Sequence, residues 1–274
     1  MGLFDGYLLC SDFDGTMAHE ARVSQENCDA IAYFQKEGGI FCPTSGRLVG
    51  FFGAYADRFC LNGPVVTLNG SVISEYAKDS HEERMLYIGG TPRALTVEFL
   101  QDALKLPGIQ GAYIYTIGRC MLIPSEDRVG RLSECEDVGS MEDIPESVQK
   151  IVLYHDMVHL SEIRAYLEPK YGDRLFLGSS WERGYEAQLI GTEKGSAALR
   201  VKEMVGAHTL VAVGDYGNDI PMLKAADIGY AVENALDEVK AAADRITVSC
   251  TDHAIARIVE DLKRDIMKKG KGSI

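Results

Sequence analysis

The sequence lacks any uncharged apolar run long enough for a membrane-spanning helix. It also lacks a basic N-terminal region followed by a long apolar run, so we expect no signal peptide. Its seven cysteines include no Cys-x-x-Cys pair, and their odd number suggests neither a disulfide framework nor a zinc site. These absences favour a protein of a reducing compartment, and we expect it to be cytoplasmic.

Basic residues are scarce relative to acidic ones. The chain has 28 lysines and arginines against 41 aspartates and glutamates, and its formal net charge is −13 at pH 7. A surface of this sign repels nucleic-acid backbones and anionic membranes, so we expect neither as a partner. It gives no general attraction to a phosphorylated small molecule either, so any anion site must be local.

The 274 residues, 46% of them hydrophobic, are enough for one large domain or two modest ones. Short apolar runs alternate with helical patterns at the start of the chain. We expect strands at 8–11, 40–42 and 65–68, and helices at 25–37 and 48–59, with Ser24 as the cap of the first helix. The same alternation returns after residue 190, and it is typical of a doubly wound α/β layer with a parallel sheet.

The middle of the chain follows a different pattern. From about residue 75 to 185, strand patterns follow one another directly, as in a hairpin expected at 112–123. Thr91 and Pro92 are expected to cap and open a helix that runs to about residue 105. Adjacent strands favour a mixed α+β insert. We therefore expect a Rossmann-like parallel-sheet core of residues 1–78 and 190–274 and an inserted α+β cap domain at 79–189.

Two aspartates follow the first predicted strand, in the run Ser-Asp-Phe-Asp-Gly-Thr at 11–16. Ligands of open α/β sheets bind beyond the carboxyl ends of the strands, which is where Asp12 and Asp14 would lie. Two acids there repel each other, so they need a cation or a shared proton. An EF-hand loop is excluded because its sixth and twelfth positions would be Met17 and Val23. A plain turn at the strand end is the other interpretation.

Further polar segments follow predicted strands or open predicted helices. They are Thr44-Ser45-Gly46-Arg47, Asn69-Gly70, Lys194-Gly195 and the run Gly-Asp-Tyr-Gly-Asn-Asp at 214–219. Together with the first run, they resemble the motifs of the haloacid dehalogenase-like superfamily of phosphohydrolases. The resemblance is closest to the Cof-type subgroup (IIB), which carries a large α/β cap. The order and spacing of the motifs account for nearly all of the chain.

The resemblance implies a magnesium-dependent phosphatase for a small phosphorylated metabolite, such as a sugar phosphate or a cofactor- or nucleotide-like phosphate. Asp12 would be the nucleophile that forms an aspartyl-phosphate, and Asp14 would act as acid and then as base. The phosphate would be bound by Ser45, Gly46, Lys194 and Asn218. Mg²⁺ would be held by Asp12, the backbone carbonyl of Asp14, and Asp215. Asp219 would orient Lys194 or a metal-bound water.

Charge arithmetic also favours a metal. Like charges about 4 Å apart repel by about 4 kcal/mol at an effective dielectric near 20. Asp12, Asp215 and a dianionic phosphate would meet at one place, and Lys194 alone cannot offset their repulsion. Mg²⁺ is a hard cation that takes oxygen ligands and keeps waters, so it suits such a site.

Each segment also has a purely structural interpretation. Ser45 could be only a helix cap, Lys194 a solvated lysine at a helix start, and residues 217–219 a turn. Arg47 is left unassigned, since it could pair with a carboxylate. Trp181 and Tyr185 could line the substrate or pack in the core.

Two other functions fit the same motifs. A phosphomutase would pass the phosphoryl group of Asp12 to a sugar hydroxyl, and a regulatory protein would bind a phosphorylated ligand without turnover. The fold alone does not choose among the three. The sequence does not reveal the substrate, the cap residues that set specificity or the oligomeric state.

Overall fold

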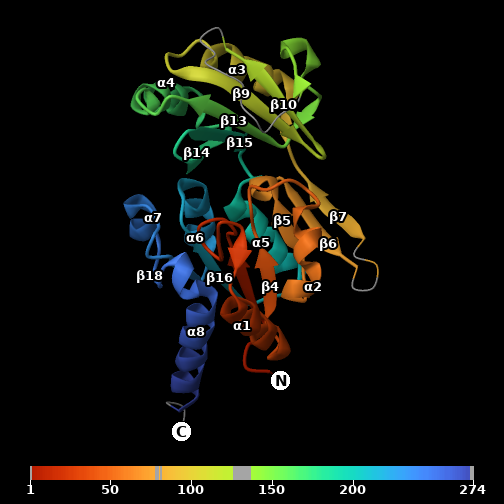
Figure 1. The fold of residues 1–274 in the computed structure, drawn as a ribbon, viewed down its shortest axis with the longest axis vertical. Coiled ribbons are helices and arrows are strands. Elements are labelled where there is room, and N and C mark those ends of the chain that lie inside the picture. Colours follow the sequence, from red (N-terminus) through yellow and green to blue (C-terminus); the bar gives the residue numbers. More distant parts are fainter. Residues whose placement is uncertain (1, 78–79, 81, 126–136, 272–274) are drawn as a thin grey trace.

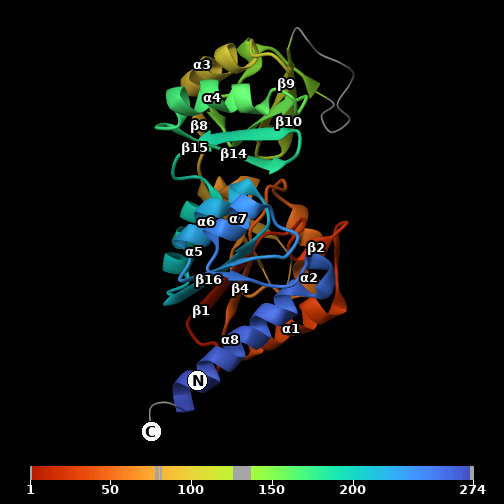
Figure 2. The ribbon, with the colours of Figure 1, turned by 90° about the vertical axis from the view of Figure 1, so that its left-hand side faces the viewer.

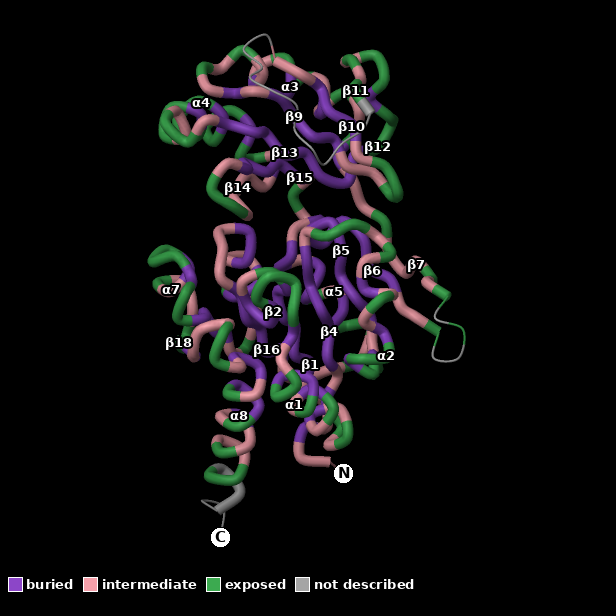
Figure 3. Tube along the Cα trace, viewed as in Figure 1, coloured by how far each residue is buried: buried purple, intermediate pink, exposed green. Residues whose placement is uncertain are grey.

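The computed structural model describes residues 2–77, 80, 82–125 and 137–271. The chain folds into two stacked parts: both ends of the sequence build the lower part, and the middle builds the upper part (Figure 1). Each part has its own hydrophobic cluster, one drawn from residues 4–73 and 197–262 and the other from residues 99–187. The buried segments lie in the interior of each part (Figure 3).

A five-stranded parallel sheet forms the centre of the lower part. Its spatial order is β18 (Arg245–Ile246), β17 (Ile228–Ala231), β16 (Thr209–Gly214), β1 (Tyr7–Ser11) and β4 (Ile40–Pro43). The apolar run of β1 is fully buried at Leu8, Leu9 and Cys10. This burial is what a parallel strand covered on both faces requires.

Helices cover both faces of this sheet. They are α1 (Gln25–Lys36), α2 (Ala56–Phe59), α5 (Lys194–Met204), α6 (Ile220–Ala225), α7 (Asp237–Ala242) and α8 (Ala254–Lys271). Helix α1 packs on α8, and α5 packs on α6 on the other side of the sheet (Figure 2). The predicted doubly wound α/β fold is therefore confirmed. The predicted cap of α1 is present, since the Ser24 side chain accepts a hydrogen bond of 3.2 Å from the Asn27 amide.

A smaller antiparallel sheet lies beside β4. It consists of β5 (Val65–Thr67), β6 (Val72–Tyr76) and β7 (Glu83–Ile88). Strand β7 falls in the range assigned from sequence to the cap, yet it pairs with β6, and Leu86 and Tyr87 pack on the lower cluster. We propose that the first domain boundary lies after residue 88. The second boundary, at 189/190, stays a prediction.

The upper part is built on a six-stranded mixed sheet. Its order is β11 (Asp137–Val138), β10 (Arg119–Pro124), β9 (Ile109–Thr116), β13 (Lys150–His155), β15 (Gly184–Leu189) and β14 (Leu175–Trp181). Strands β9 and β10 are the predicted hairpin. Helices α3 (Arg93–Ala103) and α4 (Leu160–Tyr171) lie above the sheet, which separates them from the lower part (Figure 2). The predicted α+β insert is thus present.

Short elements complete the described fold. They are β2 (Ala18–His19), β3 (Arg22–Val23), β8 (Thr91–Pro92), β12 (Ser147–Val148), η1 (Phe51–Tyr55), η2 (Leu68–Gly70), η3 (Met141–Asp143), η4 (Gly217–Asp219) and η5 (Cys250–Asp252).

Two predicted helices differ in the structure. The helix expected at 48–59 begins later, as the 3₁₀ turn η1 followed by α2, because Gly50 adopts a φ of +87°. The helix expected from Thr91 and Pro92 to about residue 105 is present as α3 (Arg93–Ala103), with Pro92 at its N-cap position and no side chain capping it. Thr91 and Pro92 themselves form β8 and pair with β12. At Gly50 a backbone constraint prevails over a local helical pattern.

Among the described residues, no helix is long and apolar enough to cross a membrane. Five described cysteines are free, whereas Cys120 is disulfide-bonded, which the sequence analysis did not predict.

Candidate active site

Polar residues from distant segments meet at the carboxyl edge of the parallel sheet. Strands β4, β1 and β16 are neighbours, so the residues that follow them come together. Asp12 follows β1, Ser45 follows β4 by two residues, and Asp215 follows β16. Lys194 comes from the first turn of α5.

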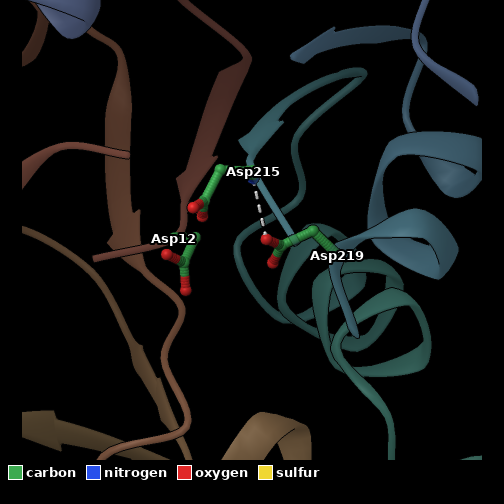
Figure 4. Close-up of side chains that lie close together, drawn as sticks. All are labelled: Asp12, Asp215 and Asp219. Atoms are coloured by element: carbon green, nitrogen blue, oxygen red, sulfur yellow. Dashed lines mark hydrogen bonds between the residues drawn. The ribbon is translucent and has the colours of Figure 1, made fainter. Parts of the chain in front are cut away.

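Three carboxylates form the centre of this group. Asp12, Asp215 and Asp219 each place one oxygen within 4.8 Å of the others (Figure 4). Asp12 and Asp219 are buried, and Asp215 is half-buried. Buried carboxylates at this spacing repel one another unless a cation or a proton lies among them.

Lys194 supplies one such cation. Its buried ammonium donates hydrogen bonds of 2.6 Å to Asp12 Oδ1 and of 2.6 Å to Asp219 Oδ1. Burial lowers the pKa of Lys194, but the charges of the two carboxylates outweigh this and raise the pKa above its ordinary value. Lys194 therefore stays charged and is held in one position.

Asp219 serves as the support of this arrangement. Its second oxygen, Oδ2, accepts hydrogen bonds from the backbone amides of Asp215 at 3.0 Å and Tyr216 at 3.1 Å. The carboxylate thus connects Lys194 to the loop that carries Asp215. This geometry agrees with the predicted orienting role of Asp219, which stays a prediction.

The lysine does not neutralise the cluster. Burial is the main cause that raises the pKa of Asp12 well above the usual carboxyl range, although Lys194 opposes it. Burial, together with the charge of Asp219, raises the pKa of Asp215 to about 7. Both shifts show that burial makes the ionised form of these carboxyls costly, and the neighbouring carboxylates add to that cost. A hard divalent cation with oxygen ligands would relieve it, so the donor set fits Mg²⁺.

The turn after Asp14 is shaped around Asp215. Thr16 donates a hydrogen bond of 3.0 Å to Asp215 Oδ1. Gly15 has a φ of +78°, and a Cβ atom there would lie 2.4 Å from Asp215 Oδ2. Only glycine permits both the backbone conformation and this approach. Thr16 was not among the predicted site residues, although it ends the Asp-x-Asp-Gly-Thr motif.

Asp14 lies apart from the carboxylate cluster. Its side chain is 46% exposed and accepts two hydrogen bonds from Arg47, from Nε at 2.7 Å and from the terminal nitrogen at 2.6 Å. The Arg47 guanidinium also lies 5.0 Å from the centroid of the Phe51 ring. The Asp14 carboxylate therefore faces the open side of the site in a fixed orientation.

The loop after β4 and two asparagines form the neighbouring wall. The Ser45 backbone carbonyl accepts from the Asn69 amide at 2.9 Å, and the Asn69 side chain accepts from Asn218 at 3.2 Å. Ser45 and Asn218 are buried. The Gly46 carbonyl accepts a hydrogen bond of 2.8 Å from Lys150 of the upper part.

A cavity of about 720 Å³ opens between the two parts over this wall. Predicted site residues that line it are Asp12, Asp14, Ser45, Gly46, Asp215 and Asn218. Lys194 lies behind Asp12, held by its two carboxylate contacts. Trp181 lines the cavity, whereas Tyr185 is buried and donates to Glu168 at 3.0 Å.

A family model described as haloacid dehalogenase-like hydrolase matches residues 9–259. The chain belongs to the haloacid dehalogenase-like hydrolase family. It is 23% identical over 266 residues to the 5-amino-6-(5-phospho-D-ribitylamino)uracil phosphatase YitU of Bacillus subtilis, covering 93% of this chain and 97% of that protein. It is 24% identical over 270 residues to the pyridoxal phosphate phosphatase YbhA of Escherichia coli, covering 92% and 97%.

A solved structure shares the fold of this haloacid dehalogenase-like hydrolase. It is the HAD subclass IIB sugar phosphatase BT4131, with a TM-score of 0.74, 19% identity, and coverage of 93% of this chain and 98% of that chain. The predicted Cof-type family and the predicted enzyme class, a phosphatase, are confirmed. The roles assigned to single residues stay predictions.

Two charged residues of this hydrolase's upper part escaped the sequence analysis. Lys150 and Glu186 line the cavity and lie 3.6 Å apart, and Glu186 also accepts hydrogen bonds from Asn69 and Ser180. Glu186 occupies a strand that alternates apolar and polar positions, and Lys150 precedes the apolar run of β13. No local signal distinguishes them from surface residues, because their partners are distant in the chain.

Proposed function

We propose that this chain is a Mg²⁺-dependent phosphatase that hydrolyses a phosphate monoester of a small metabolite through an aspartyl-phosphate at Asp12. The observation that carries the proposal is the contact of buried Lys194 with Asp12 and Asp219, beside Asp215, where Asp12 and Asp215 line the cavity. The named relatives act on a phosphorylated ribitylaminouracil and on pyridoxal phosphate, which are small phosphorylated molecules.

The proposed chemistry assigns the first bond change to Asp12. One carboxylate oxygen attacks phosphorus while the bond from phosphorus to the ester oxygen breaks. Lys194 holds Asp12 Oδ1 and carries a positive charge beside the phosphoryl group. The aspartate is thereby oriented, and part of the repulsion between nucleophile and phosphate is offset.

Asp14 would move the protons. It gives a proton to the departing alcohol oxygen and then takes one from the water that attacks the phosphoenzyme, which releases inorganic phosphate and restores Asp12. Arg47 keeps the Asp14 carboxylate facing the cavity through its two hydrogen bonds. The Ser45 hydroxyl, the loop amides and Asn218 would bind the phosphoryl oxygens.

Asp12 and Asp215 would hold the Mg²⁺ ion together with the Asp14 backbone carbonyl. When bound, the ion would supply a Lewis acid that offsets the charge of the carboxylates and the phosphate. Thr16 and Gly15 keep Asp215 in place for this task.

The test is phosphate release from p-nitrophenyl phosphate by the purified full-length chain. Activity should require Mg²⁺ and disappear on treatment with a chelator. Asp12→Asn should lose at least about a thousandfold in kcat, because the amide cannot act as the nucleophile. Asp29→Asn, an exposed substitution on α1, serves as the matched control and should keep full activity.

An Asp12→Asn variant that hydrolyses the ester at the parent rate would overturn the proposal, as would rates that ignore Mg²⁺. Product analysis with a hexose phosphate separates the alternative functions. Free phosphate supports the phosphatase, an isomerised sugar phosphate supports a mutase, and binding without turnover supports a regulatory protein.

A further inference from the structure

We infer that the phosphomonoester accepted by this site carries a flat aromatic or heteroaromatic ring in its alcohol part. The inference rests on the proposed function and deepens it by naming the substrate class. It comes from the upper wall of the cavity, which is the face of the six-stranded sheet opposite to α3 and α4.

Aromatic rings dominate this wall. Its rings come from β9, β13 and β14, and they are Tyr113, Tyr115, Tyr154 and Trp181. Tyr113 and Tyr154 also pack with Leu122 and Val152 in a small cluster that is separate from the cluster under the helices. The sheet therefore turns a second apolar face toward the cavity.

Tyr154 and Trp181 are neighbouring rings, and we call this pair the platform. The ring centroids of Tyr154 and Trp181 lie 5.6 Å apart with an interplanar angle of 35°. The Arg183 guanidinium lies 4.3 Å from the centroid of the Tyr154 ring. Trp181 is 41% exposed although it lines the cavity. A large exposed ring beside a second ring can cover a flat ligand by stacking.

Tyr115 lies close to the loop of Ser45 and Gly46, which would bind the phosphate. The Lys150 ammonium is 4.5 Å from the centroid of the Tyr115 ring and donates to the Gly46 carbonyl at 2.8 Å. One ammonium group thus separates an aromatic ring from the loop that would hold the phosphate. The alcohol part of a bound ester would leave this loop along the aromatic wall.

The charged side chains of the wall bind the protein itself. Glu186 is buried, accepts hydrogen bonds from Asn69 and Ser180, and lies 3.6 Å from Lys150. A polyhydroxylated alcohol is recognised through several hydrogen bonds, and its own polar groups are costly to bury without them. A ring needs an apolar face instead, and this wall presents that of Trp181, which is 41% exposed and is backed by the buried ring of Tyr154.

Uridine 5′-monophosphate and ribose 5-phosphate are matched probes, because they differ only at the anomeric carbon, which carries uracil in the first and a hydroxyl group in the second. Trp181 is the single tryptophan of the chain, so its fluorescence reports a ligand on the platform without turnover. In the full-length Asp12→Asn variant with Mg²⁺, uridine monophosphate should quench this fluorescence and bind about tenfold or more tightly than ribose 5-phosphate.

Kinetics give the second readout. Trp181→Leu should raise KM for uridine monophosphate by about tenfold more than KM for ribose 5-phosphate, since stacking contributes to the ring ester alone. Tyr166→Leu on α4 removes an exposed ring away from the cavity and should change neither value. Pyridoxine 5′-phosphate serves as a second ring ester, with a pyridine ring in place of uracil.

The inference fails if ribose 5-phosphate binds as tightly as both ring esters, or if Trp181→Leu affects all three esters equally. Failure of the proposed function would give a different result in the same assays. In that case no ester, p-nitrophenyl phosphate included, releases phosphate in the presence of Mg²⁺, while the fluorescence titration still reports whether rings bind.

Discussion

At the residue scale, the site depends on side chains that constrain one another. Lys194 is held between Asp12 and Asp219, and Asp219 is in turn held by the amides of Asp215 and Tyr216. Removing one partner would leave a buried charge without compensation, which costs more than the net energy of the pair. The ammonium and the carboxylates are therefore positioned before a ligand arrives.

Gly15 offers a sharp test of this positioning. Gly15→Ala should lower kcat/KM by more than tenfold, because its Cβ would lie 2.4 Å from Asp215 Oδ2 and displace that carboxylate. Gly118→Ala is the matched control: its φ is also +78°, but nothing lies within 4 Å of the added Cβ. It should cost about 1–2 kcal/mol of stability and leave activity unchanged.

Equal activity of the two glycine variants would contradict this account of Asp215. The measurements are steady-state kinetics with p-nitrophenyl phosphate and urea unfolding of each variant.

Arg47 provides a second test at this scale. Arg47→Ala should lower kcat by about tenfold or more for an alkyl phosphate, whose leaving oxygen needs the proton from a well-oriented Asp14. The loss should be smaller for p-nitrophenyl phosphate, since nitrophenolate leaves without protonation. Arg84→Ala on β7 removes a similar pair with Glu75 of β6 and should leave both rates unchanged. Equal losses for the two esters would contradict the role of Asp14.

At the scale of the elements, strand ends and helix starts carry the chemistry. The residues after β1, β4 and β16 are brought together because parallel neighbours end at the same edge of the sheet. Apolar runs followed by polar turn residues made these strand ends predictable. The prediction of one helix at 48–59 was wrong, because Gly50 interrupts it and a 3₁₀ turn precedes α2.

The first helix has a predicted cap whose contribution can be measured. Ser24→Ala should lower the free energy of unfolding by about 1 kcal/mol, because the Asn27 amide loses its acceptor. Ser24→Asp keeps an acceptor at the same place and should stay close to the parent. Urea unfolding measures both variants, and an alanine variant as stable as the parent would show that the cap contributes nothing.

At the scale of the whole molecule, the two parts enclose the site between them. Lys150 and Glu186 of the upper sheet contact Gly46 and Asn69 of the lower part. The Gln188 side chain donates to the Leu68 carbonyl at 2.9 Å. The cavity therefore exists only when both parts are folded and joined, and its walls combine a polar floor with an aromatic roof.

The stability of the upper part should depend on pH through His155. Burial lowers the pKa of His155 below its usual value, with Arg183 acting in the same direction and Asp156 opposing. The unfolded chain therefore takes up this proton first, so stability should fall as pH drops below about 6.5, by at most about 1.4 kcal/mol per pH unit.

His155→Gln should remove this part of the slope, because glutamine does not titrate and can still accept from the Met157 amide. Urea unfolding of parent and variant at pH 7.5 and 5.5 gives the comparison. The raised pKa of Asp215 acts in the opposite direction in both proteins and cancels in the difference. An unchanged slope in the variant would contradict the prediction.

The amino-acid sequence alone determined the doubly wound core, the insert, the family and the loops that carry Asp12, Ser45, Lys194 and Asp215. These features depend on contiguous runs of apolar and turn residues, which local physical chemistry decides. The contacts of Lys150 with Gly46 and of Glu186 with Asn69 join residues more than a hundred positions apart. Such partners, and the aromatic wall above them, are chosen by the packing of the complete fold, because their free energy belongs to no single segment.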